Sequence, residues 1–276
     1  PIPKNGYDLV EISTEQLYED NDEITLSVDV DVHNYHATDA PVQLKVKFDN
    51  EEKEVTIPKN EPGEHRYNVK FSTKGKEKWT VHEYGKPILY PLTATLCGQS
   101  ITKKIGVRKL IVDCHDDEYG TTFQFLLNGK IVTALGADFI PTDSIPYRAT
   151  RDRTYQLMKD MVESNMNIVR VWGGGYFDDQ IVDICDELGI LVWQDFMFGC
   201  AEYPNDDEYH QEIADEFHDN ILRMKHHASI ALWCGDNEDF LAMTWLPYTR
   251  DFQIYLRNEY KKFNTFCKEL CQKYDP

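Results

Sequence analysis

Residues 165–175 read Asn165-Met-Asn-Ile-Val-Arg170-Val-Trp172-Gly-Gly-Gly175, and this stretch decides the fold of the second half of the chain. Its apolar residues follow one another without alternation, which is typical of a strand in a parallel sheet covered on both faces. A helical pattern over 150–164 precedes it, and another over 178–188 follows it and ends at Gly189. The stretch is therefore predicted to be one strand of a β-α repeat.

The same unit recurs along the second half of the chain. Further strands are expected at 131–140, 190–196 and 230–234, and further helices at 208–226 and 249–274. Residues 123–127 and 130–134 are also expected to form two strands around the turn at Asn128-Gly129. Repeated β-α units with short connections indicate a (β/α)8 barrel, in which eight strands close on themselves. Four units account for half of such a barrel. The pattern leaves two interpretations, a half-barrel and an open α/β sheet, of which we favour the half-barrel.

The first half of the chain has a period of two. Residues 24–32 and 42–48 alternate apolar and polar side chains, as strands with one buried face do. Turn-forming residues such as those at 59–63 separate these segments from further alternating ones. The pattern predicts an antiparallel β-sandwich over residues 1–110, followed by the α/β region over residues 111–276.

Charge and composition argue against several classes of function. The 276 residues carry a net charge of −19, which repels the phosphate groups of nucleic acids and of anionic membranes. No apolar run approaches the ~20 residues that span a bilayer. The seven cysteines are odd in number and dispersed, which favours free thiols in a reducing compartment such as the cytoplasm over disulfides or a zinc site. We expect no cofactor and no metal.

Polar and aromatic side chains gather where the predicted strands end. These positions are Asp138, Arg170, Trp172, Asp195, Trp233 and the run Asp236-Asn237-Glu238-Asp239. The carboxyl ends of parallel strands meet at one edge, where barrel enzymes have their active sites. Aromatic faces and hydrogen-bonding groups together suit a polyhydroxylated ligand such as a sugar. Burial in the core explains each tryptophan equally well when taken singly, and a solvated loop is the alternative for the acidic run.

Three segments taken together resemble the β-mannosidases of glycoside hydrolase family 2. They are residues 165–175, 188–198 and 226–238, which contain Arg170, Asp195 and Glu238 respectively. Residues 136–141 also resemble the first barrel strand of that family, and residues 79–92 resemble the last part of its immunoglobulin-like domain. The resemblance implies an immunoglobulin-like β-sandwich followed by the first half of a TIM barrel.

The resemblance also implies an activity, the release of β-linked mannose from non-reducing ends by a retaining double displacement. Glu238 matches the general acid/base, and Asn237 matches the residue that bonds the sugar 2-hydroxyl. Arg170 matches the arginine that orients the nucleophile. The remaining residues that we assign to substrate binding are Trp172, Asp195 and Trp233.

The chain departs from the family pattern in several places. Asp138 and Asp236 stand where the family usually has Asn, and the nucleophile and the second half of the barrel would lie beyond Pro276. The chain is therefore interpreted as an internal fragment, inactive by itself, of an enzyme with an oligosaccharide substrate. The open half-barrel is expected to pair with its missing half or to form a homodimer. Two alternatives stay open: a non-catalytic carbohydrate-binding or structural fragment, and another family 2 exo-glycosidase (β-glucosaminidase, β-galactosidase or β-glucuronidase).

Overall fold

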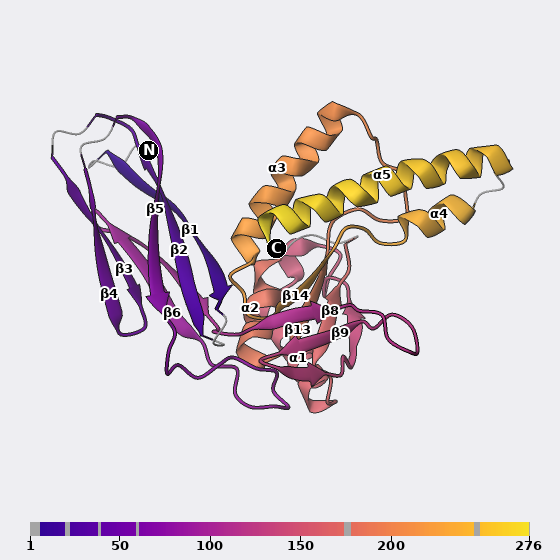
Figure 1. Cartoon of the computed structure of the whole chain (residues 1–276), viewed down its shortest axis with the longest axis horizontal. Helices are drawn as coiled ribbons and strands as arrows, with labels where there is room; N and C mark the ends of the chain where they lie inside the picture. Colours follow the sequence, from indigo (N-terminus) through magenta and orange to yellow (C-terminus); the bar gives the residue numbers. More distant parts are fainter. Residues whose placement is uncertain are drawn as a thin grey trace. The chain divides into compact units, whose positions relative to one another are not determined.

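The computed structural model describes residues 6–19, 23–37, 40–58, 61–173, 178–245 and 249–275. The chain divides into two compact units (Figure 1). The first comprises Pro1–Thr80, Pro87–Lys109 and His226–Ala228, and the second comprises Val81–Lys86, Leu110–Lys225 and Ser229–Pro276. Relative to the division expected after residue 110, residues 81–86 thus belong to the second unit and residues 226–228 to the first.

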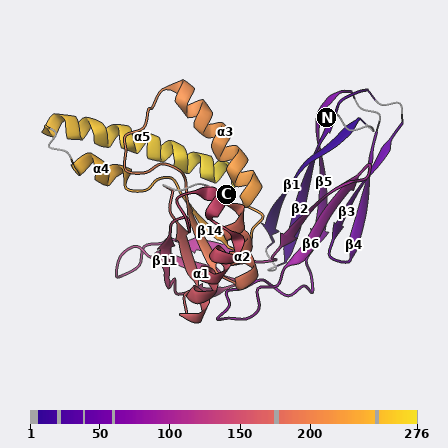
Figure 2. The ribbon, with the colours of Figure 1, turned by 180° about the vertical axis from the view of Figure 1, so that it is seen from behind.

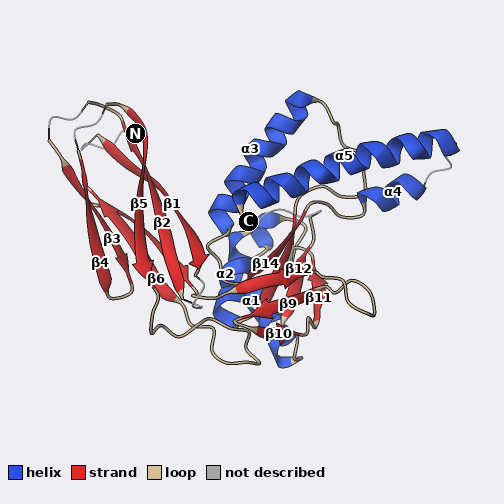
Figure 3. Ribbon diagram, in the orientation of Figure 1, coloured by secondary structure: helices blue, strands red, loops and turns tan. Residues whose placement is uncertain are grey.

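The first unit is an antiparallel β-sandwich. Its strands are β1 (Tyr7–Tyr18), β2 (Ile24–Asn34), β3 (Val42–Phe48), β4 (Glu51–Ile57), β5 (Gly63–Ser72), β6 (Tyr90–Leu96) and β7 (Gln99–Ile105). One sheet has the order β1-β2-β5 and the other has the order β4-β3-β6-β7 (Figure 3). The predicted alternation lies in β2, where Leu26, Val28 and Val30 are fully buried. Because the same alternation buries one face of each sheet, apolar side chains from both sheets form a single core.

The second unit is built on a four-stranded parallel sheet. Its strands, in spatial order, are β11 (Gly136–Phe139), β12 (Ile168–Val171), β13 (Leu191–Asp195) and β14 (Ile230–Cys234). The helices of this unit are η1 (Pro146–Arg148), α1 (Arg151–Glu163), α2 (Asp179–Leu188), α3 (Asp207–Met224), α4 (Asp239–Trp245) and α5 (Arg250–Tyr274). The alternation of parallel strands and helices predicted from the sequence is therefore confirmed.

Helices cover one face of the parallel sheet (Figure 2). Val169, Val171 and Val192 point to this face and pack against buried side chains of α1 and α2 in one core cluster. The helix α2 ends at Gly189, whose φ of 71° is the left-handed conformation that glycine adopts without strain. Since side chains alternate along a strand, Arg170 and Trp193 point to the opposite face.

A small antiparallel sheet precedes the parallel one. It consists of β8 (Leu110–Asp113), β9 (Gln124–Leu127) and β10 (Lys130–Val132), in the order β10-β9-β8. The turn between β9 and β10 is Asn128-Gly129, and both residues have the positive φ that two-residue hairpin turns require. The single strand expected over 131–140 is therefore wrong. The turn sets Lys130 opposite Leu127 and so draws Ile131 into the hairpin, leaving only 136–139 for β11.

The longest helix, α5, has 25 residues and packs on α3. Its buried residues are Leu256, Phe263, Cys267 and Leu270, whose successive spacings of seven, four and three residues place them along one side of the helix. This spacing gives an amphipathic helix whose apolar side packs against buried side chains of α3. In the described part of the chain, no helix combines the length and the apolar character needed to cross a membrane.

Candidate functional site

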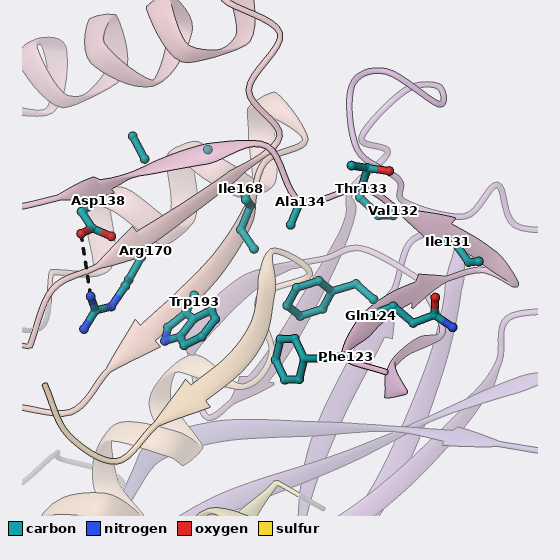
Figure 4. Close-up of a pocket in the computed structure, with 13 residues that line it drawn as sticks. Phe123, Gln124, Ile131, Val132, Thr133, Ala134, Asp138, Ile168, Arg170 and Trp193 are labelled. Atoms are coloured by element: carbon teal, nitrogen blue, oxygen red, sulfur yellow. Dashed lines mark ion pairs between the residues drawn. The ribbon is translucent and has the colours of Figure 1, made fainter. Parts of the chain in front are cut away.

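Arg170 in β12 holds together a polar group at the carboxyl end of the parallel sheet. Its guanidinium donates two hydrogen bonds to Asp195, from Nε to Oδ1 at 3.1 Å and from Nη2 to Oδ2 at 2.6 Å. Nη2 also donates to Oδ1 of Asn237 at 2.6 Å. Asp138 forms a longer ion pair with Nη1 at 3.8 Å (Figure 4). The structure thus brings together three of the predicted site residues: Arg170, Asp195 and Asn237.

The strand register explains why these side chains converge. In the parallel ladder, Asp138 lies opposite Arg170, which in turn lies opposite Trp193. Asp195 is two residues beyond Trp193, so it points to the same face and lies one step nearer the carboxyl edge. The long side chain of Arg170 reaches across this step, and the planar guanidinium then matches the two oxygens of the carboxylate.

Burial and the arginine act in opposite directions on Asp195. The side chain is completely buried, and this burial raises the pKa of the carboxyl group from its usual 3.8. The Arg170 guanidinium opposes the shift, as does the N–H of Gly173, which lies 3.3 Å from Oδ2. Hydrogen bonding to Asp195 in turn raises the pKa of Arg170. Because the guanidinium stays charged and forks onto both carboxylate oxygens, we treat the pair as ionised. Both carboxylate oxygens of Asp195 are thus already hydrogen-bonded to Arg170.

The loop after β14 is tied to the loop after β13 by backbone hydrogen bonds. The N–H of Asn237 donates to the carbonyl of Phe198, and the N–H of Cys200 donates to the carbonyl of Asn237, both at 2.8 Å. Asn237 is buried by this tie, whereas Glu238 is exposed and has a left-handed φ of 59°. The Glu238 carboxylate accepts a hydrogen bond from the Cys200 thiol, with 3.6 Å between Oε2 and Sγ. The fold therefore presents Glu238 to solvent directly beside the residue that Arg170 holds.

Asp239 is a buried carboxyl group that the sequence reasoning did not single out. It is 1% exposed, and burial together with the neighbouring Asp236 raises its pKa to about 7. Its Oδ1 accepts from the N–H of Ala201 at 3.3 Å, whereas Oδ2 has no hydrogen-bond partner among the described residues. Asp236 is held by Asn264 and Tyr260, whose side chains donate to Oδ2 at 3.1 and 3.3 Å. In the sequence, Asp239 is one of four adjacent polar residues, and no local pattern marks it as buried.

Of the two predicted tryptophans, Trp233 lies on the other side of the sheet from Arg170. Trp233 lies opposite Gln194 in the register, and it packs partly buried against the core clusters beneath the helices. Its indole N–H donates to Asp275 at 2.8 Å. Trp172 lines a narrow cavity with Thr154 of α1 and other residues on the helix side. The geometry therefore does not group Trp233 with Arg170, and the assignment of both tryptophans to substrate binding stays a prediction. Of the glycines that follow Trp172, those at 174 and 175 lie outside the described residues.

A cavity of about 550 Å³ lies on the face of the sheet that the helices do not cover (Figure 4). Its wall is apolar at one end, where Phe123 lies with its ring 6.2 Å from the indole of Trp193. Arg170 and Asp138 line the other end. The cavity therefore has a charged end at the strand ends and an apolar end beside Phe123 and Trp193. Across the described ranges, no group of three or more His, Cys, Asp and Glu side chains could hold a metal ion.

Comparisons with known proteins agree on one family. The family model for "Glycosyl hydrolases family 2" matches residues 9–108. Beta-mannosidase B of Aspergillus clavatus is 38% identical over 191 residues, which cover 67% of this chain and 23% of that protein. Beta-mannosidase B of Aspergillus fumigatus is 30% identical over 278 residues, which cover 95% of this chain and 32% of that protein. The matched segments thus span 23% and 32% of the length of these two relatives.

Solved structures extend the likeness to the fold. A beta-D-mannosidase from Dictyoglomus thermophilum superposes with a TM-score of 0.84 at 26% identity, over 98% of this chain and 34% of that one. A beta-glucuronidase from Bacteroides uniformis, at 20% identity, shares the fold alone, with a TM-score of 0.78 over 98% of this chain and 32% of that one. The parallel sheet, the preceding β-sandwich and these relatives lead to one conclusion: the chain belongs to glycosyl hydrolase family 2.

Proposed function

We propose that this chain supplies the general acid/base of a retaining β-mannosidase and that Glu238 is that residue. The observation that carries the proposal is the arrangement of the two tied loops. Arg170 bonds Asn237, and the backbone tie to Cys200 leaves Glu238 exposed next in the chain. An exposed carboxyl group beside a fixed amide can approach the glycosidic oxygen of a sugar whose hydroxyl groups the amide binds.

A retaining mechanism needs a second carboxylate ~5–5.5 Å from the acid/base. Three carboxyl groups on β13 and on the loop after β14 are already hydrogen-bonded or buried within the described part of the chain. Asp195 is bonded by Arg170, Asp239 is buried, and Asp236 accepts from two side chains of α5. We therefore propose that the nucleophile comes from protein outside this sequence, and that residues 1–276 alone do not turn over substrate.

The same reasoning supports a half-barrel rather than an open sheet. In an open α/β sheet helices cover both faces, but here the face that carries Arg170 and Trp193 lines a cavity. Phe123 and Ile131, which also line the cavity, are 54% and 55% exposed. We propose that further strands complete a barrel over this face. When they are absent, the exposed face drives self-association, and sedimentation velocity of the isolated chain should detect a dimer or larger species.

A β-linked mannoside is the substrate that we propose. The support is that the three relatives reported above at more than 25% identity are named beta-mannosidases. The alternative specificities within the family are β-glucosaminides, β-galactosides and β-glucuronides. A panel of 4-nitrophenyl glycosides distinguishes them, because the aryl leaving group is the same and only the sugar changes. The β-mannoside should give the highest kcat/KM.

The decisive experiment uses the intact protein that carries this sequence, and the Glu238→Gln variant of it. The substitution keeps the shape and removes the proton donor, so kcat on the aryl β-mannoside should fall by about 10²–10⁴-fold. Glu163→Gln on α1 is the matched control, because Glu163 is an exposed glutamate at the end of that helix. Its kcat should equal that of the wild type. Loss of less than about twofold in Glu238→Gln would show that another group protonates the leaving oxygen.

Binding without catalysis is the second candidate for the isolated chain. The observation that favours it is that Asp195 and Asp236 are hydrogen-bonded to other side chains and Asp239 is buried. Calorimetric titration of the isolated chain with mannose and with β-1,4-mannobiose tests this function directly. Turnover by the isolated chain that Glu238→Gln abolishes would refute both the missing nucleophile and this second candidate.

A further inference from the structure

Cys200 touches the two residues that matter most at the candidate site. Its Sγ lies 3.6 Å from Oε2 of Glu238 and 3.5 Å from Nδ2 of Asn237. The sulfur therefore has the geometry to donate its proton to the carboxylate and to accept one from the amide. A thiol has one donor and weak acceptor capacity, so these two contacts use both.

The backbone fixes Cys200 in this place. Its N–H donates to the carbonyl of Asn237 at 2.8 Å, and its φ of 56° lies in the left-handed region. Gly199 forms an isolated parallel bridge with Asn237, and its N–H donates to the Tyr203 hydroxyl at 2.8 Å. A non-glycine residue adopts a left-handed φ at a cost, so its surroundings must hold it there. These backbone contacts thus fix the position of Cys200 next to Asn237 and Glu238.

We propose that Cys200 is a positioning residue for Glu238, whose thiol donates a hydrogen bond to Oε2 and limits the carboxyl group to the rotamer that faces the substrate. This inference rests on the proposed function of Glu238. Under this proposal, Cys200 on the loop after β13 orients Glu238 on the loop after β14.

The thiol suits this role because it stays protonated. Desolvation of the sulfur and the nearby Glu238 carboxylate both raise the pKa of Cys200 above its usual 9.0. A neutral thiol attracts the carboxylate, whereas a thiolate would repel it. An exposed carboxyl group with no such contact would sample several rotamers, and only one of them would hold the proton in line with the glycosidic oxygen.

The first test examines the contact and needs no activity. Iodoacetamide reacts with thiolates, so its rate at Cys200 near pH 8 reports how strongly Glu238 suppresses ionisation of that thiol. In the Glu238→Gln variant the rate at Cys200 should rise at least about threefold, because a negative charge near 4 Å is removed. The rate at the exposed Cys114, measured by mass spectrometry of the same digest, should not change. An unchanged rate at Cys200 would overturn the contact.

The second test examines the role in the intact protein that carries this sequence. Cys200→Ala should lower kcat on the aryl β-mannoside by about tenfold with KM within about twofold, as expected for one lost hydrogen bond to a charged group. Cys200→Ser should restore most of kcat, because its hydroxyl donates as the thiol does. Cys114→Ala is the matched control and should keep wild-type kcat. Wild-type kcat in Cys200→Ala, or no recovery in a folded Cys200→Ser protein, would overturn the proposal.

The two tests separate failure of this inference from failure of the proposed function. If the intact protein shows no activity that depends on Glu238, the proposed function fails, and the catalytic role of Cys200 fails with it. A faster alkylation in Glu238→Gln would then support a structural contact only. If the activity depends on Glu238 and Cys200→Ala is unaffected, the proposed function stands and the positioning role alone is wrong.

Discussion

Replacing Arg170 by Met should destabilise the α/β unit strongly, because it removes the partner of a fully buried charge. Asp195 is 0% exposed and receives two hydrogen bonds from the guanidinium, and Asn237 receives a third. Met keeps much of the length and apolar stem of Arg, so the change isolates the loss of charge and of donors. The N–H of Gly173, at 3.3 Å, is left as a weak donor to Asp195.

The size of the effect follows from burial. Breaking a buried ion pair by removing one partner costs about 3–5 kcal/mol. Arg170 is 28% exposed, so part of its own desolvation is regained in water, and we expect a loss near the lower end, about 3 kcal/mol. The matched control is Arg151→Met. Arg151 and Glu187 are 43% and 28% exposed, so loss of that pair should cost less than about 1 kcal/mol.

The loss should depend on pH, and the sign can be worked out. Without Arg170, burial of Asp195 is opposed only by hydrogen bonds from the Gly173 N–H and the Cys234 thiol, so its pKa in the folded state rises further. A carboxyl group whose pKa is higher in the folded than in the unfolded state weakens folding as pH rises through that interval. The destabilisation should therefore be small near pH 4 and largest above neutral pH. Adding Asp195→Asn to Arg170→Met should recover part of the loss at pH 7.5.

Urea unfolding followed by tryptophan fluorescence is the suitable assay, because all of the five tryptophans except Trp79 lie in the second unit. Circular dichroism of the folded variants checks that the structure is retained before urea is added. A loss below about 1 kcal/mol at pH 7.5, or an equal loss at pH 4 and pH 7.5, would refute the view that Arg170 neutralises a buried charge.

Two further predictions concern stability. Asp239 has a pKa of about 7 in the fold against 3.8 as its ordinary value, so the native state binds its proton more tightly, and this group should contribute a loss on the order of 4 kcal/mol of unfolding free energy between pH 4 and pH 7.5. Asp239→Asn should remove that contribution, and urea titrations in which the wild type and Asp239→Asn show the same pH dependence would contradict the assignment. A Cβ at Gly173 would lie 1.9 Å from the carbonyl oxygen of Phe196, so Gly173→Ala should cost about 3 kcal/mol by urea unfolding. Gly199→Ala is its control, since a Cβ there meets nothing nearer than 3.8 Å and should change stability by less than about 1 kcal/mol; equal losses in the two variants would show that the backbone beside Gly173 yields freely.

Local periodicity was enough to predict the elements. A period of two over residues 24–32 gives a strand with one buried face, and β2 has that face in the sandwich core. The continuous apolar run before Arg170 predicts a strand of a parallel sheet, as β12 is. These patterns report only on the nearest few residues, which is why the limits of β11 were misjudged. The turn at Asn128-Gly129 competed for Ile131, and the periodicity could not show which partner would win.

The convergence of Arg170, Asp195 and Asn237 was likewise within reach of the sequence. Parallel strands end at a common edge, so polar residues at or just after the ends of three such strands must lie near one another. The sequence thus predicted that these three residues lie close together. Whether Glu238 performs the proposed chemistry is a question for the kinetic experiments.

Tertiary structure alone decided which side chains face each other and which are buried. The sequence places Trp233 at a strand end, but the register opposite Gln194 turns it toward the helices. Nothing near Cys200 in the sequence indicates Glu238, and the 3.6 Å contact exists because the loops of two neighbouring strands are tied by their backbones. Asp239 owes its raised pKa to burial beside Asp236 rather than to its place in the chain. Periodicity is a local property, whereas contact and desolvation arise only when distant segments pack, so the sequence determined the elements and their common edge, and the packing determined the chemistry of each group.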